Sequence, residues 1–227
     1  MSKKDSIKYF NNIANKIGLK YNNLDLYVTS FTHTSYANEH KTLNNERLEF
    51  LGDAILDFLV GEYLYNNYTD MVEGKMTKFR AQYVCQDANC SYAKSLGLDK
   101  CLLLGRGEKE QGGLTKPSIL GDLFEAFLGA VYLDQGIEMA RRVLEIVVFP
   151  NIKYEDHDYK SRLQEYIQAE SRKGVEYIME GESGPNHDKN FTFSVYHDGI
   201  KLGTGNGRNK KEAEQNAAKD ALSKLVK

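Results

Sequence analysis

The spacing of apolar residues changes after about residue 150, and this change limits the folds that the chain can adopt. Before it, apolar residues recur every three or four positions, as in the stripe from Leu48 to Tyr63, an interval typical of amphipathic helices. Beyond residue 170 the apolar residues alternate with polar ones, which is typical of strands that bury one face. The sequence therefore predicts two domains of different classes.

The first predicted domain spans residues 1–150 and is all-helical. Apolar spacing predicts helices near residues 48–63, 120–133 and 137–148, and Pro150 ends the last one. Residues 151–157 are mostly polar and are interpreted as a linker.

Residues 158–227 are predicted to form a small α+β domain of the order αβββα. A helix over residues 160–170 precedes alternating segments near 175–180 and 191–196. Asp198-Gly199 favours a two-residue hairpin, because a type I′ turn needs positive φ angles that glycine tolerates. A strand returns from Ile200, and a final helix covers residues 209–225.

Composition excludes several classes of protein. The formal charge of −2 gives no general positive field, so any nucleic-acid contact must come from individually placed residues. Cys85, Cys90 and Cys101 have neither the spacing nor the histidine neighbours of a zinc site, and are expected to be reduced thiols. No apolar run approaches the roughly 20 residues of a membrane span. We expect a soluble, cytoplasmic protein that does not contact membranes.

Five carboxylates stand at helical spacing in two segments. Glu46, Glu49 and Asp53 share one helix face, and Asp122 and Glu125 share another beside strongly apolar neighbours. Unpaired acids at the edge of a core are costly. A hard divalent cation would offset that cost, and oxygen ligands suit Mg²⁺ or Mn²⁺.

The residues alone leave a second interpretation open, in which these acids are solvated helix surface paired with lysines. Gly52 and Gly121 lie inside the two helical patterns, where glycine is unfavourable, so each indicates close packing. Spacing within each helix cannot show that the two helices meet.

The nine residues from Glu46 to Ala54 (Glu-Arg-Leu-Glu-Phe-Leu-Gly-Asp-Ala) resemble the signature of ribonuclease III catalytic domains. Residues 32–36, 106–108 and 116–125 resemble the same family in order and spacing. The resemblance implies a ribonuclease III endonuclease fold. It implies that Glu49, Asp122 and Glu125 bind Mg²⁺, which Mn²⁺ can replace. It also implies that Asp53 and Glu125 are the catalytic acids, and it leaves the role of Glu46 open.

The same resemblance implies the reaction. The enzyme would hydrolyse double-stranded RNA to 5′-phosphate and 3′-hydroxyl ends with a two-nucleotide 3′ overhang, in processing ribosomal RNA precursors and other structured transcripts. It would act as a homodimer in which Phe50 contacts the partner subunit. From the residues alone, Phe50 could equally belong to the core.

Residues 205–218 resemble the double-stranded-RNA-binding domain. Such domains recognise the shape of the duplex across two minor grooves and the phosphates between them. Asn209 is also expected to cap the last helix, with Glu212 completing a capping box. The RNA-binding residues that the resemblance implies are Gln164, Gln168, Pro185 and His187 at the minor grooves and Lys210 and Lys211 at the phosphates.

Two other functions are compatible with parts of the sequence. A catalytically inactive RNA-binding protein could share the fold, although all four acids of the proposed site are present. A phosphohydrolase of small nucleotides could use the acids alone, although the RNA-binding segment argues against it. Metal-dependent cleavage of duplex RNA would distinguish an endonuclease from the inactive RNA-binding protein. Competition by duplex RNA would test whether the chain acts on small nucleotides instead.

Overall fold

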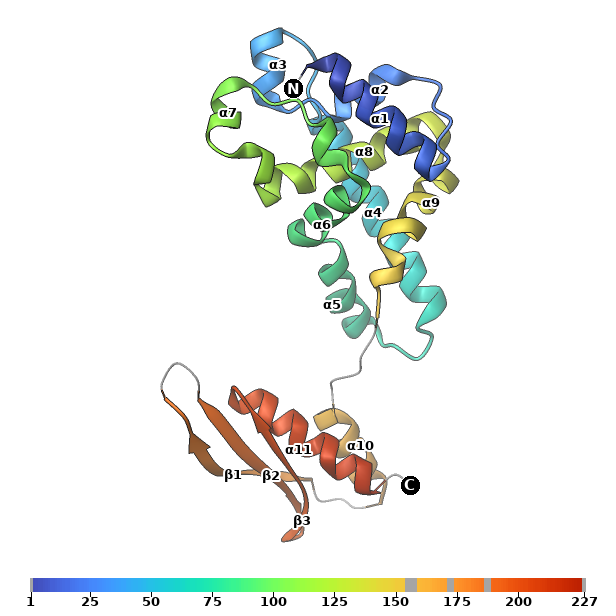
Figure 1. Cartoon of the computed structure of the whole chain (residues 1–227). Helices are drawn as coiled ribbons and strands as arrows, with labels where there is room; N and C mark the ends of the chain where they lie inside the picture. Colours follow the sequence, from blue (N-terminus) through green and yellow to red (C-terminus); the bar gives the residue numbers. More distant parts are fainter. Residues whose placement is uncertain (1, 154–158, 171–173, 186–188, 226–227) are drawn as a thin grey trace. The chain divides into compact units, whose positions relative to one another are not determined.

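The computed structural model describes residues 2–153, 159–170, 174–185 and 189–225 (Figure 1). The chain divides into two compact units, Met1–Lys153 and Tyr154–Lys227. Among these described residues the first unit is helical and the second holds a three-stranded sheet with two helices, so the predicted fold classes are confirmed. Most of the predicted linker, residues 154–157, lies outside the described residues. In the described part of the chain, no helix has both the length and the apolar character needed to cross a membrane.

The first unit is built from α-helices joined by short 3₁₀ turns. Pro117 begins α8, where its missing N–H costs nothing, and Gly136 ends that helix. The α-helices are α1 (Lys3–Ile17), α2 (Leu24–Ser30), α3 (Thr34–His40), α4 (Glu46–Asn67), α5 (Glu73–Tyr83), α6 (Gln86–Leu96), α7 (Arg106–Glu110), α8 (Pro117–Gln135) and α9 (Ile137–Val147), and the 3₁₀ turns are η1 (Leu98–Cys101), η2 (Gly113–Thr115) and η3 (Phe149–Asn151).

Helices α4 and α8 form the centre of this unit, and glycines bring their backbones together. A Cβ atom on Gly52 of α4 would lie 1.8 Å from the carbonyl oxygen of Glu125 in α8. A Cβ atom on Gly129 of α8 would lie 2.3 Å from the carbonyl oxygen of Leu48 in α4. Only hydrogen fits at either place, so the close packing expected from Gly52 is confirmed. Gly121 approaches α6 instead, where a Cβ atom would lie 3.3 Å from the carbonyl oxygen of Gln86.

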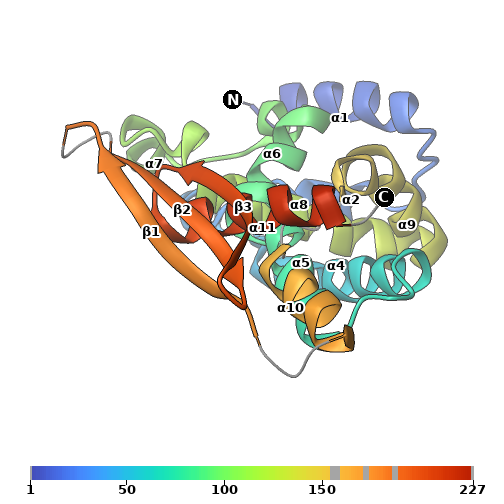
Figure 2. The same ribbon diagram turned by 90° about the horizontal axis from the view of Figure 1, so that it is seen from below.

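The second unit contains α10 (Tyr159–Glu170), β1 (Glu176–Ser183), β2 (Asn190–His197), β3 (Ile200–Gly207) and α11 (Lys210–Leu225). The strands are antiparallel in the order β1-β2-β3. Helix α11 packs across β2 and β3 with α10 beside it (Figure 2). Leu163, Val195 and Ala217 are fully buried between the helices and the sheet. The predicted hairpin turn is confirmed, because Asp198 and Gly199 have φ angles of 48° and 76°.

Candidate active site

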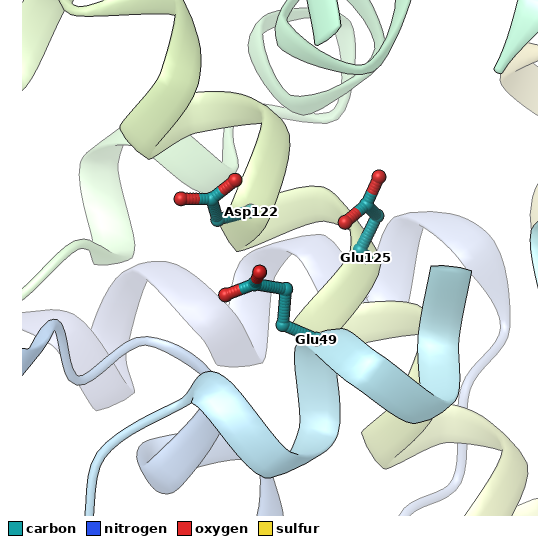
Figure 3. A group of neighbouring side chains, drawn as sticks. All are labelled: Glu49, Asp122 and Glu125. Carbon is teal, nitrogen blue, oxygen red and sulfur yellow. The ribbon is translucent and has the colours of Figure 1, made fainter. Parts of the chain in front are cut away.

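Three carboxylates from two helices meet in the first unit. Glu49 projects from α4 towards Asp122 and Glu125 on the adjacent α8 (Figure 3). One carboxylate oxygen from each residue lies within 4.8 Å of the other two. We call Glu49, Asp122 and Glu125 the carboxylate trio.

Local sequence explains how the trio assembles. Asp122 and Glu125 are three residues apart and so project from the same side of α8. Glu49 lies one turn before Gly52, the residue that touches the Glu125 backbone. The glycine contact between the helices therefore also fixes the distance between the acids.

Burial raises the pKa values of all three acids. The pKa of Glu125 rises to about 8, mainly through burial and then through the charges of Asp53, Asp122 and Glu49. The pKa of Glu49 rises to about 7, again mainly through burial and then through neighbouring acids. Burial also raises the pKa of Asp122, although the electrostatic interaction with His33 opposes the shift. The folded protein thus holds negative charge here only at a cost.

Within the described ranges of the chain, no basic side chain relieves that cost by pairing directly with the trio. The ion pairs of this unit involve other acids, such as Glu108 with Lys116 at 2.6 Å and Asp57 with Arg80 at 3.8 Å. Like charges about 4 Å apart repel by roughly 4 kcal/mol at an effective dielectric constant of 20. A divalent cation is the simplest group that would remove this repulsion.

Asn89 on α6 contacts the trio and was not predicted from the sequence. Its Nδ2 donates a hydrogen bond of 2.7 Å to Oε1 of Glu125 and a longer one of 3.3 Å to the Val84 carbonyl oxygen. The side chain is fully buried. A signal was present, since Asn89 shares its helix face with the buried Tyr92, Ala93 and Leu96, where an apolar residue is expected.

Asp53 and Glu46 lie at the edge of the trio. Asp53 is exposed, and the trio does not include it, yet its charge contributes to the raised pKa values of Glu49 and Glu125. Although the residue is exposed, partial desolvation of its carboxyl group and then the charge of Asp57 raise the pKa of Asp53 itself. Glu46 is exposed and accepts hydrogen bonds of 3.0 Å from both Thr34 and Asn44. The five predicted acids therefore occupy one region, with three at its centre.

Phe50 does not belong to the core of its own chain, because 81% of its surface is exposed. Phe58 and Tyr65 of the same helix are also exposed, at 58% and 72%. At 100° per residue these three aromatic residues fall within a sector of about 80°. Exposed apolar faces of this kind mark interaction surfaces.

The residues predicted to bind RNA belong to the second unit. Lys210 and Lys211 are exposed in the first turn of α11. The Asn209 side chain caps that helix by accepting from the Glu212 N–H at 2.9 Å, as predicted. Glu212 accepts a hydrogen bond from the Arg208 N–H instead of the Asn209 N–H of a standard capping box.

The other residues predicted to contact RNA differ in their exposure and in the hydrogen bonds that they already make. Gln168 and Pro185 are exposed. Gln164 is half-buried, and its amide oxygen accepts from the Val175 N–H at 3.4 Å, so part of this side chain is already engaged. His187 lies outside the described residues.

Comparisons with known proteins agree with both units. Residues 23–152 match the family described as Ribonuclease-III-like, and residues 159–225 match the double-stranded RNA binding motif. A protein named Ribonuclease 3 from Listeria monocytogenes serovar 1/2a is 45% identical over 221 residues, which cover 94% of this chain and 96% of that protein. Ribonuclease 3 from Shouchella clausii is 44% identical over 225 residues, covering 96% of this chain and 86% of that protein.

A solved structure is also similar to the first unit. It is the nuclease domain of ribonuclease III from Campylobacter jejuni, described for structural flexibility in a region involved in dimer formation. The TM-score is 0.57 at 38% sequence identity, and the match covers 61% of this chain and 96% of that one.

Proposed function

This chain belongs to the ribonuclease III family, and we propose that it is a Mg²⁺-dependent endonuclease that cuts double-stranded RNA as a homodimer. The observation that carries the proposal is the carboxylate trio, in which three oxygens from α4 and α8 lie within 4.8 Å of one another. The domain organisation that we propose is catalysis and dimerisation in residues 1–150 and RNA binding in residues 158–227.

The trio fits a divalent metal ion by its donor chemistry. All three ligand atoms are carboxylate oxygens, which Mg²⁺ and Mn²⁺ prefer. Mg²⁺ usually keeps several of its waters and takes few carboxylates directly, so a loosely spaced trio suits it. When bound, the ion would neutralise phosphate oxygens and lower the pKa of a coordinated water.

The acids divide the remaining work between them. Glu49, Asp122 and Glu125 would hold the ion, and the exposed Asp53 at the edge would orient water beside the phosphate. In the proposed reaction, water attacks phosphorus and its hydroxyl stays on the 5′-phosphate. The bond from phosphorus to the 3′ oxygen breaks, and that oxygen leaves as a hydroxyl. No serine or cysteine nucleophile is required.

The exposed aromatic face of α4 supports the proposed homodimer. Phe50, Phe58 and Tyr65 offer an apolar surface that a second copy of the chain would cover. A two-fold axis is the commonest symmetry of such pairs. It would supply two carboxylate trios, one for each RNA strand, and we expect them to cut with a two-nucleotide 3′ overhang.

The second unit supports recognition of duplex RNA. The N-terminus of α11 offers backbone N–H groups and the exposed Lys210 and Lys211 to phosphates. We propose that Gln164, Gln168, Pro185 and His187 contact the flanking minor grooves. The proposed substrates are structured transcripts, including ribosomal RNA precursors. We propose that the reaction takes place in the cytoplasm, where the buried thiols Cys90 and Cys101 would stay reduced.

The function is tested by Glu125→Gln, which keeps the shape of the side chain and removes its charge. We expect Mg²⁺-dependent cleavage of a labelled duplex to fall at least about 100-fold, since the change removes a proposed metal ligand. Binding of the duplex, measured by gel shift without metal, should stay within about twofold, because much of the affinity comes from phosphate contacts in the other unit. Cleavage by this variant near the wild-type rate would show that the metal assignment is wrong.

A further inference from the structure

We infer that Asn89 is a positioning residue that holds the Glu125 carboxylate in the orientation in which it binds the metal ion. This inference rests on the proposed function and adds a residue from a third helix, α6, to the site. We do not propose Asn89 as a ligand of the metal ion. It acts through its hydrogen bond of 2.7 Å to Oε1 of Glu125.

The contacts of Asn89 fix which way its amide points. Both groups that face Nδ2, the Glu125 carboxylate and the Val84 carbonyl oxygen, are acceptors. A flipped amide would place Oδ1 against two acceptors, so the NH₂ group must face them. Each of its two hydrogens then has a partner, and the direction of donation to Glu125 is set by the protein backbone.

The neighbouring helices hold the amide in place. Asn89 is fully buried on α6, and a Cβ atom on Gly121 of α8 would lie 3.7 Å from the Asn89 Cβ. This close approach of α6 and α8 places the amide beside Glu125, which lies one helical turn after Asp122 on α8. The donor therefore stands on a rigid, packed element, which is what an oriented ligand requires.

Folding alone does not explain an asparagine at this place. Its Oδ1 atom is buried without a hydrogen-bond partner among the described residues. A buried polar atom left unsatisfied is destabilising. An apolar residue of similar size would avoid that cost, and the rest of this face of α6 is apolar or small. The amide is useful where it donates to a charged carboxylate, because such bonds are the stronger ones.

The test compares Asn89→Leu and Asn89→Ala with Cys90→Ala, a matched control at a buried position of the same helix. Mn²⁺ binding to the RNA-free full-length protein is measured by electron paramagnetic resonance. We expect both Asn89 variants to bind Mn²⁺ about tenfold more weakly, the lower end of the usual effect of losing a partner of a metal ligand. Cys90→Ala should bind as the wild type does.

Two further measurements separate positioning from a merely structural role. In cleavage assays, the Mg²⁺ concentration that gives half the maximal rate should rise about tenfold for Asn89→Leu, while the rate at saturating Mg²⁺ stays within about threefold. The melting temperature of metal-free Asn89→Leu should stay close to that of Cys90→Ala, because removal of the unsatisfied Oδ1 offsets loss of the hydrogen bonds to Val84 and Glu125. If both Asn89 variants melt far below the control, or if their Mn²⁺ affinity is unchanged, the inference is wrong.

Glu125→Gln distinguishes failure of this inference from failure of the proposed function. If Glu125→Gln loses Mn²⁺ binding and the Asn89 variants do not, the metal site stands and the role of Asn89 is rejected. If Glu125→Gln binds Mn²⁺ as tightly as the wild type, the proposed metal site itself is rejected, and the inference with it.

Discussion

At the scale of single residues, folding favours the neutral form of the acids at the candidate site, whereas the proposed metal binding needs their charged form. Glu49 and Glu125 are half-buried beside other acids, so each is easier to keep neutral than charged. Metal binding needs the charged forms, because a protonated carboxyl is a poor ligand. At the proposed metal site, the ion and protons would therefore compete for the same oxygens.

The raised pKa of Glu125 predicts how the stability of the metal-free protein depends on pH. The folded pKa of Glu125, about 8, lies above its ordinary value of 4.5, so the unfolded chain loses this proton first as pH rises. Stability linked to Glu125 is therefore intact below pH 4.5 and is lost as pH rises to about 8. We expect the melting temperature of the metal-free wild type, relative to Glu125→Gln, to fall between about pH 5 and about pH 8.

Calorimetry of both proteins in chelator at several pH values would measure this difference, and saturating Mg²⁺ should reduce its dependence on pH. The subtraction removes groups such as Asp134, whose lowered pKa is common to both proteins. A melting-temperature difference that stays constant across this pH range would contradict the raised pKa of Glu125.

The sequence singled out the acids that the structure brings together, and it did not single out Asn89, for a physical reason. Acids beside an apolar stripe have an energetic cost that is visible in the sequence, and their helical spacing fixes which ones share a face. The role of Asn89 depends on the neighbouring helix α8, which packs against it at Gly121 and carries Glu125. Nothing within residues 86–96 indicates that Glu125 is the partner.

At the scale of elements, the contact between α4 and α8 determines whether a site exists. The periods of both helices were predictable, because amphipathic spacing is a local property. Their pairing depends on contacts far apart in sequence, and of the two glycines singled out in the sequence only Gly52 lies at this contact. Gly129, which completes the contact from the side of α8, was not singled out because small residues in a long apolar helix are common.

Gly52→Ala tests this contact. The added methyl group would lie 1.8 Å from a backbone oxygen, which cannot move aside without shifting α8. We expect a loss of about 1–3 kcal/mol in the free energy of unfolding, the usual cost of overpacking. Weaker Mn²⁺ binding should accompany it, since the same shift separates Glu49 from Glu125.

Gly61→Ala is the matched control on the same helix. Its Cβ would make an ordinary contact of 3.7 Å with the flexible Arg80 side chain. Alanine is the better helix former, so stability should be equal or higher by up to about 1 kcal/mol. Equal unfolding midpoints in urea for the Gly52 and Gly61 variants would show that the helix contact is not as tight as described.

At the scale of the whole molecule, the chain joins two compact units that match two different families. The change of apolar period predicted this division, because each class of secondary structure leaves its own pattern. The prediction that two copies associate came only from the family resemblance. An exposed Phe50 and a core Phe50 look alike in a sequence, and the difference appears only when the packing of α4 is known.

A mixed dimer tests the proposed assembly. One subunit carries Glu125→Gln and a different affinity tag, so that the mixed species can be purified with both tags. Because each carboxylate trio would cut one strand, we expect this dimer to nick one strand of a duplex and leave the other intact. Native and denaturing gels of a doubly labelled duplex measure this, with a doubly tagged wild-type dimer as control. Double-strand cuts at the wild-type ratio, or a fully active monomer in sedimentation, would refute the proposed assembly.

The glycine contact and the acids that it brings together respond in opposite ways to random mutation. Replacing an acid would remove repulsion, so we expect a stable, folded protein that no longer cuts RNA, whereas replacing Gly52 or Gly129 would force the two helix backbones apart. If selection for cleavage were relaxed, the acids would drift away first while both glycines persisted. A lineage that used this scaffold only to bind RNA would therefore be recognisable by intact glycines beside missing acids.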